Sequence, residues 1–344
     1  MTERTARRPR RGAGLVPGLA PGLVARLALP AAARRFALVG ALVVVIAFFA
    51  VFAPGFARAG NLADVLRDNF ALLAIASLGM TLALSLGAID LSLGTAIDMA
   101  SLVFVLLSAH QVATPIAALA GLAAAAAVGA FNGVLIARIG IAPFLATLGT
   151  LFIGQTVQQL ATDGGQPVYL LNLALPPLFS ALAHGTLLGL PVPLWIVAAL
   201  ALAVHAALAW SGFGRAAAAL GAQPGVARYS GLPVAAVTFA GFVASALIYG
   251  VVGLLLSSTV KAYVPLSGNG YLLNAIGATF IGTTLSPARR PSVPGTLLGV
   301  LLLSLVANGL LLTGWNFYWQ QVATGVLIFA VLALGFAGRR DAHA

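Results

Sequence analysis

The sequence predicts an all-α polytopic membrane protein with about ten transmembrane helices. Of its 344 residues, 61% are hydrophobic and 7% are charged, whereas a soluble globular domain carries about 25% charged residues. Apolar runs of about twenty residues, enough to cross a bilayer as a helix, follow one another from Phe36 to Phe336. The basic residues lie ahead of the first run or in the short gaps between runs, as topology determinants do.

The apolar runs place the helices at residues 36–53, 70–88, 92–109, 114–137, 141–161, 194–210, 233–257, 271–283, 295–313 and 318–337. The eighth run is too short for a bilayer core about 30 Å thick. We expect it either to extend backwards over Gly268-Asn269-Gly270 or to be a broken, re-entrant element. Such an element is tolerated only where protein or a water-filled cavity covers its backbone.

The distribution of Lys and Arg predicts the topology. With a cytoplasmic N-terminus, fifteen basic residues fall on inner segments: eight in residues 1–35, then Arg138, Arg215, Arg228, Arg289, Arg290, Arg339 and Arg340. Three fall on outer segments: Arg58, Arg67 and Lys261. This asymmetry follows the positive-inside rule, so we expect both termini in the cytoplasm. It leaves no basic patch on a soluble domain, which argues against a nucleic-acid partner despite the net charge of +11.

Three regions follow from composition. Residues 1–35 are rich in Arg, Gly and Pro and are expected to form a disordered basic cytoplasmic tail. Residues 36–338 form the membrane domain, and residues 339–344 a short cytoplasmic C-terminal tail. A faint repeat divides the membrane domain: Asn132–Ile136 reads NGVLI and Asn308–Leu312 reads NGLLL. Five spans separate the two, which fits an inverted repeat of spans two to five and seven to ten; the alternative is a chance match in Leu- and Ala-rich sequence.

Motifs of catalysis and nucleotide binding are absent from the sequence. There is no G-x-x-x-x-G-K-[ST], H-E-x-x-H or G-x-S-x-G, and the chain has no cysteine. The four histidines are scattered singly. The sequence therefore argues against an enzyme, against ATP binding by this chain and against a metal site.

Two acidic residues stand inside an apolar run, where a carboxylate is costly. Asp90 lies between Gly87 and Gly94, so we expect the helix to be broken there. Asp90 then either caps the start of the next helix or contacts a solute. Asp98, eight residues on, lies about 80° round a continuous helix from Asp90, and its role stays open between the same alternatives.

The longest inner segment after the tail is Ser211–Val237. Pro224 at a first-turn position and a stop at Gly231 predict a short helix. A short helix lying at the cytoplasmic surface would be a rigid element that a partner protein could bind and push. The alternative is an ordinary loop made of good helix formers.

Five stretches resemble, in order, the landmarks of ABC importer permeases of the simple-sugar type. They are Gly87–Gly94 (GAIDLSLG), Asn132-Gly133 with Pro143–Gly149 (PFLATLG), Gly221–Leu232 (GAQPGVARYSGL), Phe280–Thr284 (FIGTT) and Tyr318–Gln321 (YWQQ). The resemblance covers about residues 38–334. It departs from the family pattern at Ala88, at Gln223-Pro224-Gly225, where an acid is lost, and at Thr283–Ser292, a more basic and stiffer loop.

The resemblance implies a permease subunit that imports a pentose or hexose by alternating access in the bacterial cytoplasmic membrane. Its partners would be separate ATPase subunits, which hold ATP and Mg²⁺, an external solute-binding protein and a second permease copy or paralogue. The chain itself would bind no cofactor. The coupling loop would be residues 211–232, with contacts at Gly221, Pro224, Ala227, Arg228, Tyr229, Ser230 and Gly231. The substrate pathway would include Asp90, Asp98, Asn132, Phe144, Asn308, Trp319 and Gln320.

Other polar residues at membrane depth or its edge are Asn69, Gln155, Gln158 and Asn274, and Asn and Gln there also join helices to one another. Two alternative functions stay open. A branched-chain amino acid or autoinducer ABC permease has a similar membrane subunit. An ion-coupled secondary transporter would also place carboxylates at broken helices, but it leaves the coupling-like loop unexplained.

Overall fold

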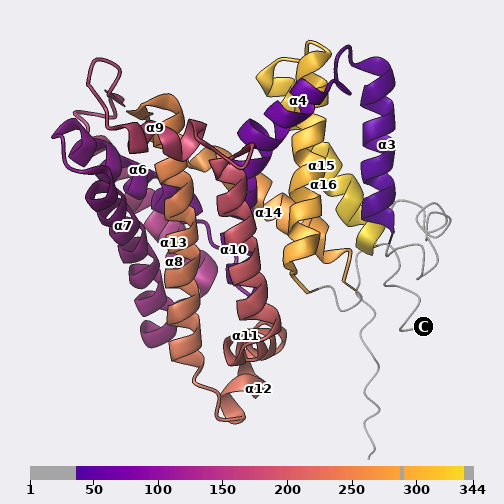
Figure 1. The fold of residues 1–344 in the computed structure, drawn as a ribbon. Helices are drawn as coiled ribbons and strands as arrows, with labels where there is room; N and C mark the ends of the chain where they lie inside the picture. The colour runs from indigo at the N-terminus through magenta and orange to yellow at the C-terminus, as the bar shows by residue number, and fades with distance from the viewer. Residues whose placement is uncertain (1–35, 287–289, 337–344) are drawn as a thin grey trace, which may run out of the picture.

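The computed structural model describes residues 36–286 and 290–336, and the tails expected at 1–35 and 339–344 lie outside these residues. The described chain is almost wholly helical (Figure 1). The N-terminal helices are α3 (Ala37–Phe52), α4 (Ala59–Asp64), the π-helix η1 (Val65–Phe70), α5 (Ala71–Ser85), α6 (Leu93–Ala109), α7 (Thr114–Val134), the π-helix η2 (Leu135–Ile139) and α8 (Pro143–Leu160). The C-terminal helices are α9 (Pro177–His184), α10 (Val192–Ala209), α11 (Gly212–Ala222), α12 (Pro224–Tyr229), α13 (Val234–Val260), α14 (Asn269–Thr283), α15 (Val293–Leu312) and α16 (Phe317–Phe336).

Two short antiparallel pairs complete the described chain. Strand β1 (Val168–Tyr169) pairs with β4 (Ala262–Tyr263), and β2 (Thr186–Leu187) pairs with β3 (Leu190–Pro191). The first pair joins segments far apart in sequence, so it ties the connection after α8 to the connection after α13. The second pair is a hairpin closed by Leu188 and Gly189, both at positive φ, as a type I′ hairpin turn requires.

Proline marks where many helices begin. It stands in the first turn of α7, α8, α9, α10, α12 and α15. The first helical N–H groups have no intrahelical acceptor, so proline costs nothing there and its fixed φ suits the helix.

Each of the ten expected spans corresponds to a helix, with two informative differences. The second helix runs unbroken from Ala59 to Ser85 and so begins eleven residues before the predicted residue 70. The charges of Asp64, Arg67 and Asp68 hid this first part of the helix from the hydropathy pattern. The eighth helix, α14, begins at Asn269 and so extends backwards over Asn269 and Gly270. Helix α9 and the strands were not predicted.

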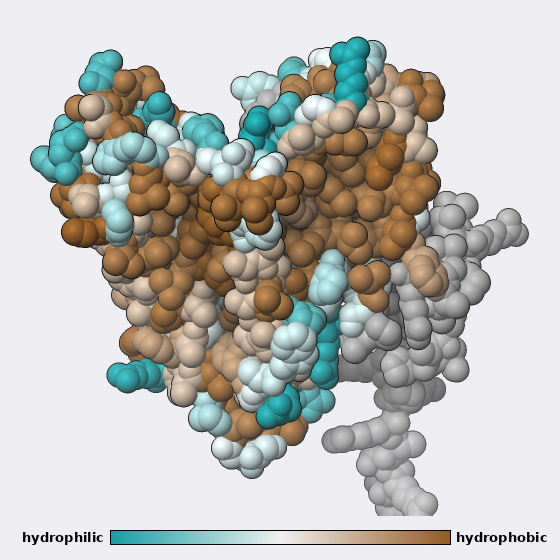
Figure 2. Space-filling model, in the orientation of Figure 1, coloured by the Kyte–Doolittle hydropathy of each residue, from teal (hydrophilic) through white to brown (hydrophobic). Residues whose placement is uncertain are grey.

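Five described helices are long and apolar enough to cross a membrane: Ala59–Ser85, Thr114–Ile139, Val192–Ala209, Val234–Val260 and Val293–Leu312. Shorter apolar helices cover Leu38–Phe52 and Leu93–Ala109. On the face shown in Figure 2, hydrophobic residues cover the middle of the molecule and hydrophilic residues gather towards its two ends. The chain is therefore a multi-pass membrane protein, and the count of ten spans stays a prediction.

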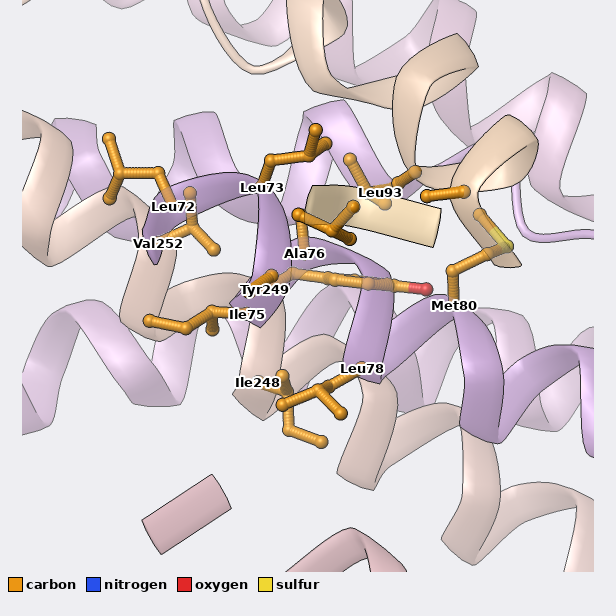
Figure 3. Packing of buried hydrophobic residues seen from close by; sticks show 14 of the residues in the cluster. Leu72, Leu73, Ile75, Ala76, Leu78, Met80, Leu93, Ile248, Tyr249 and Val252 are labelled. Atoms are coloured by element: carbon orange, nitrogen blue, oxygen red, sulfur yellow. The ribbon is translucent and has the colours of Figure 1, made fainter. Parts of the chain in front are cut away.

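Helix α5 forms the centre of the packing. Every residue from Ala71 to Ala83 is buried, and α5 packs against α10, α13, α14 and α15. Figure 3 shows the fully buried ring of Tyr249, from α13, lying among Ile75, Ala76 and Met80 of α5. Helices α11 and α12 lie at one end of the molecule, and α4 and α9 at the opposite end (Figure 1).

Candidate functional site

The predicted break at Asp90 is present. Helix α5 ends at Ser85, Gly87 takes a left-handed conformation (φ +79°), and α6 begins only at Leu93. Asp90 is buried in this break, where its Oδ1 accepts hydrogen bonds from the Ser92 backbone N–H at 2.9 Å and the Ser92 hydroxyl at 2.6 Å. The carboxylate therefore sits at the positive end of α6 and satisfies an N–H that the helix leaves free.

A relay of side chains extends from Asp90 to two further helices. The Thr150 hydroxyl of α8 donates to Asn132 Oδ1 at 2.5 Å, and Asn132 Nδ2 of α7 donates to Ser92 Oγ at 2.7 Å. Every donor in the chain points toward the Asp90 carboxylate, an arrangement in which each bond strengthens the next. The four residues are at most 5% exposed. We refer to Asp90, Ser92, Asn132 and Thr150 as the Asp90 network.

Asp98 belongs to a separate cluster. Its Oδ1 accepts from the Gly268 N–H at 2.8 Å and from the Ser267 hydroxyl at 3.2 Å, and the Gln158 side chain is a further polar neighbour. Gln158 Oε1, from α8, accepts from the Leu266 N–H at 2.9 Å and from the Tyr263 hydroxyl at 3.0 Å. Together Asp98 and Gln158 hold the segment 263–268 that leads into α14.

The two carboxylates thus accept hydrogen bonds at the starts of two different helices. Asp90 stabilises the start of α6, and Asp98, although it lies within α6, stabilises the start of α14. Both helices are short and follow a break, and a helix N-terminus attracts negative charge. Among the described residues, ion pairs form only around Arg67, so helix ends and hydroxyls, not cations, stabilise the two carboxylates.

The other predicted pathway residues do not join these clusters. Asn308 of α15 exchanges two hydrogen bonds with Asn61 of α4, an arrangement that joins helices. Phe144 is 52% exposed at the start of α8, and Trp319 is 58% exposed on α16 beside Trp315. Gln320 Nε2 donates to the Trp315 carbonyl at 2.9 Å.

The segment 211–232 forms two helices, α11 and α12. Ser211 caps α11 by accepting from the Gly214 N–H at 3.2 Å. Pro224 starts α12 and Gly231, at φ +74°, follows its end, as the spacing predicted. Ala227 is the one buried residue of α12, while Arg228, Ser230 and Tyr229 (96% exposed) face outward, and Gly221 lies at the end of α11.

Several residues of the two clusters were not singled out from sequence. Thr150 and Ser267 carry no motif of their own. Gly268 was noted only as a possible start of the eighth span, and Ser92 only as part of Gly87–Gly94. Gln158 was noted as a polar residue at membrane depth. Its polarity distinguished it from its apolar neighbours but did not predict its hydrogen-bond partners. In the part of the chain that the structure describes, no group of three His, Cys, Asp or Glu side chains could hold a metal ion.

The broken helices, the buried polar clusters and the surface helix α12 fit a membrane translocation subunit. Residues 61–332 match the family described as "Branched-chain amino acid transport system / permease component", and the chain belongs to this family of ABC transporter permeases. The resemblance expected from the five motifs is thereby confirmed.

Curated relatives extend along most of the chain. The ribose import permease RbsC of Escherichia coli K12 is 32% identical over 84% of this chain and 89% of its own length. The ribose import permease of Bacillus subtilis is 29% identical, over 85% of this chain and 90% of its own. The D-allose transport system permease AlsC of Escherichia coli K12 is 28% identical, over 85% and 89% respectively. No solved structure matches the chain.

Proposed function

We propose that this chain is the permease subunit of an ATP-driven ABC importer that carries a monosaccharide, a pentose or a hexose. The observation that carries the proposal is the 32% identity to a ribose import permease over 84% of the chain. An allose permease at 28% identity adds support for this class of solute. A neutral solute rich in hydroxyl groups also suits a membrane domain whose buried polar residues, among those the structure describes, are mostly hydroxyls and amides.

The proposed assembly places this chain in a bacterial cytoplasmic membrane with both termini inside and ten spans. Two ATPase subunits, which hold ATP and Mg²⁺, an external solute-binding protein and a second permease copy or paralogue complete the importer. The inverted repeat of spans two to five and seven to ten is part of this proposal. Support for it comes from α6 and α14, two short helices that each follow a break and have a carboxylate at their start.

In this assembly α12 is the contact for the ATPase. It projects from one end of the molecule and exposes Tyr229, Arg228 and Val226 while burying Ala227 (Figure 1). An exposed aromatic ring beside an Arg is the composition of an interface centre. Gly221, Pro224, Ser230 and Gly231 set the ends of α11 and α12 and so fix the direction in which this surface faces.

The Asp90 network and the Asp98 cluster shape the pathway by holding the starts of α6 and α14. Phe144, Trp319 and Gln320 lie on α8 and α16, where they are available to a second permease copy or to a solute. Asn308 would reach the pathway only if its amide, whose oxygen and nitrogen both bond to Asn61, exchanged this partner for the solute.

Uptake in proteoliposomes tests the proposal. The chain would be reconstituted with its partner ATPase and solute-binding protein. Uptake of radiolabelled ribose, allose, glucose and leucine would then be measured with ATP and with a non-hydrolysable analogue. We expect uptake of one sugar that requires ATP, the ATPase and the binding protein. Uptake driven by an ion gradient without them would overturn the proposal.

A branched-chain amino acid importer is the second candidate, favoured by the description of the matched family. ATP-dependent uptake of leucine, with none of the sugars transported, would establish it. The same experiment therefore separates the two candidates.

A further inference from the structure

The end of α5 and the end of α11 touch backbone to backbone. A Cβ placed on Gly221 would lie 2.6 Å from the Ser85 carbonyl oxygen and 3.1 Å from the Gly87 nitrogen. A Cβ on Gly87 would lie 3.1 Å from Gly221 Cα, and the φ of +79° at Gly87 is itself unfavourable for other residues. No side chain fits at this contact unless one of the two helices moves.

An apolar cluster packs between the end of α5 and helices α11 and α12. Leu86 follows α5 and is buried with Ala217 and Leu220 of α11 and Ala227 of α12. The Leu86 side chain also covers Gly241 of α13, where a Cβ would collide with it. Because close-packed groups have no free space between them, a displacement of α12 and α11 must also displace the end of α5.

The Asp90 network begins three residues beyond this contact. Gly87 is followed by Ala88, Ile89 and Asp90, and Asp90 bonds to Ser92 at the start of α6. Ser92 continues through Asn132 to Thr150, so that one set of hydrogen bonds joins the break to α7 and α8. The contact and the network are thus consecutive along the chain.

We infer that the Gly87–Gly221 contact, with Leu86, transmits movement of the α11–α12 surface to the Asp90 network. Gly87, Gly221 and Leu86 are positioning residues: they touch neither solute nor nucleotide, and they set where the start of α6 lies. The inference rests on the proposed function, because it takes α12 as the surface that an ATPase subunit moves. It adds the route by which that movement reaches the membrane interior.

Gly221→Ala tests the route by forcing the two backbones apart. Its matched control is Gly212→Ala in the same helix, where the added methyl meets only the Arg215 guanidinium at an ordinary 3.8 Å. Leu86→Ala is the second variant, because it loosens the same contact by removing packing without adding bulk. All are measured in the full reconstituted importer for solute transported per ATP hydrolysed. We expect this ratio to fall about 2- to 30-fold in Gly221→Ala and Leu86→Ala and to stay unchanged in Gly212→Ala.

A second readout reports the movement itself. The chain has no cysteine, so Ile89→Cys gives it a single thiol within the break. We expect the rate of maleimide labelling there to differ between nucleotide-free and ATP-bound importer, and the difference to shrink when Gly221→Ala or Leu86→Ala is added. Association with the ATPase, measured by co-purification, should remain in all variants.

The outcomes separate the two hypotheses. A wild-type chain without ATP-dependent uptake overturns the proposed function. Coupled uptake in the wild type, with an unchanged transport ratio and unchanged labelling in Leu86→Ala and in any folded Gly221→Ala, overturns the inference and leaves the function standing. If Gly221→Ala does not fold, the transport ratio and the labelling of Leu86→Ala alone decide whether the inference holds. Loss of coupling in the control Gly212→Ala as well would also overturn the specific route.

Discussion

Asn61 and Asn308 face each other as a reciprocal amide pair, with each Nδ2 donating to the other's Oδ1 at 2.9 and 3.0 Å. The residues are 247 positions apart, and Asn61 Nδ2 also donates to the Phe56 carbonyl at 2.9 Å. The pair therefore ties the start of the long helix Ala59–Ser85 to the end of α15. An amide pair of this kind joins helices in an apolar environment.

Replacing one member of the pair should cost more stability than replacing both. Asn308→Leu leaves the Asn61 amide without a partner across the interface, which costs about 1–3 kcal/mol, whereas Asn61→Leu with Asn308→Leu leaves no unpaired amide between the helices. Thermal unfolding of the wild type and of the three variants of this double-mutant cycle in one detergent measures the coupling. A stable Asn308→Leu with a changed solute preference would instead place Asn308 in the pathway.

Asp98 should tolerate Asn and not Ala. Asn retains an oxygen that accepts from the Gly268 N–H, whereas Ala leaves that buried donor unpaired, at a cost of about 1–3 kcal/mol. Ser267→Ala is the control, since it removes only the longer bond of 3.2 Å. Melting temperature and solute transport are measured together. An Asp98→Asn variant that is fully stable but transports nothing would show that the charge has a role beyond the start of α14.

Variants of Asp90 and Ser92 should impair transport. Ser92→Ala removes the hydroxyl that links Asp90 to Asn132, and Asp90→Asn removes the charge at the start of α6. We expect both to lower transport severalfold, with a loss of stability of about 1–3 kcal/mol for Ser92→Ala. Thr150→Val is the milder comparison: it removes the bonds from the Thr150 hydroxyl to Asn132 Oδ1 and to the Ala146 carbonyl, and it leaves the bonds between Asp90, Ser92 and Asn132 in place. Full transport by Asp90→Asn would remove the network from the mechanism.

Arg228 and Tyr229 should be dispensable for folding and required for coupling. Tyr229 is 96% exposed and Arg228 is exposed, so replacing both by Ala removes little packing from this chain. The expected result is an unchanged melting temperature with ATP hydrolysis no longer linked to uptake. Arg215→Ala, a change in α11 outside the exposed face of α12, serves as the control. Normal coupled transport by the double variant would exclude α12 as the contact.

Sequence reasoning succeeded where one local signal decided the structure. Hydropathy placed a helix at every expected span, and the glycine and proline positions predicted both the break at Gly87 and the ends of α12. It failed where a charge interrupts a helix: Arg67 with Asp64 and Asp68 sits in the first part of the second span, and hydropathy alone cut that part off.

The site depended on contacts that no local signal encodes. Asp98 lies 170 residues before Gly268, and no sequence feature near either residue predicts their hydrogen bond. Asn132 was expected at the pathway and forms part of the Asp90 network, while Asn308, its counterpart in the sequence repeat, pairs with Asn61 instead. Equal motifs therefore do not imply equal partners.

The long helix Ala59–Ser85 carries a charged turn near one end and the glycine break just beyond the other. Arg67, salt-bridged to Asp64 and Asp68, and Ser85, the last residue of the helix, are eighteen positions apart. At 1.5 Å per residue this is about 27 Å, close to the thickness of the hydrocarbon core of about 30 Å. The side chains of the charged turn are exposed, so sliding of the long helix along the membrane normal would draw them into lipid at a high cost. We therefore expect the central helix to take part in a conformational change by tilting or rotating and not by piston movement.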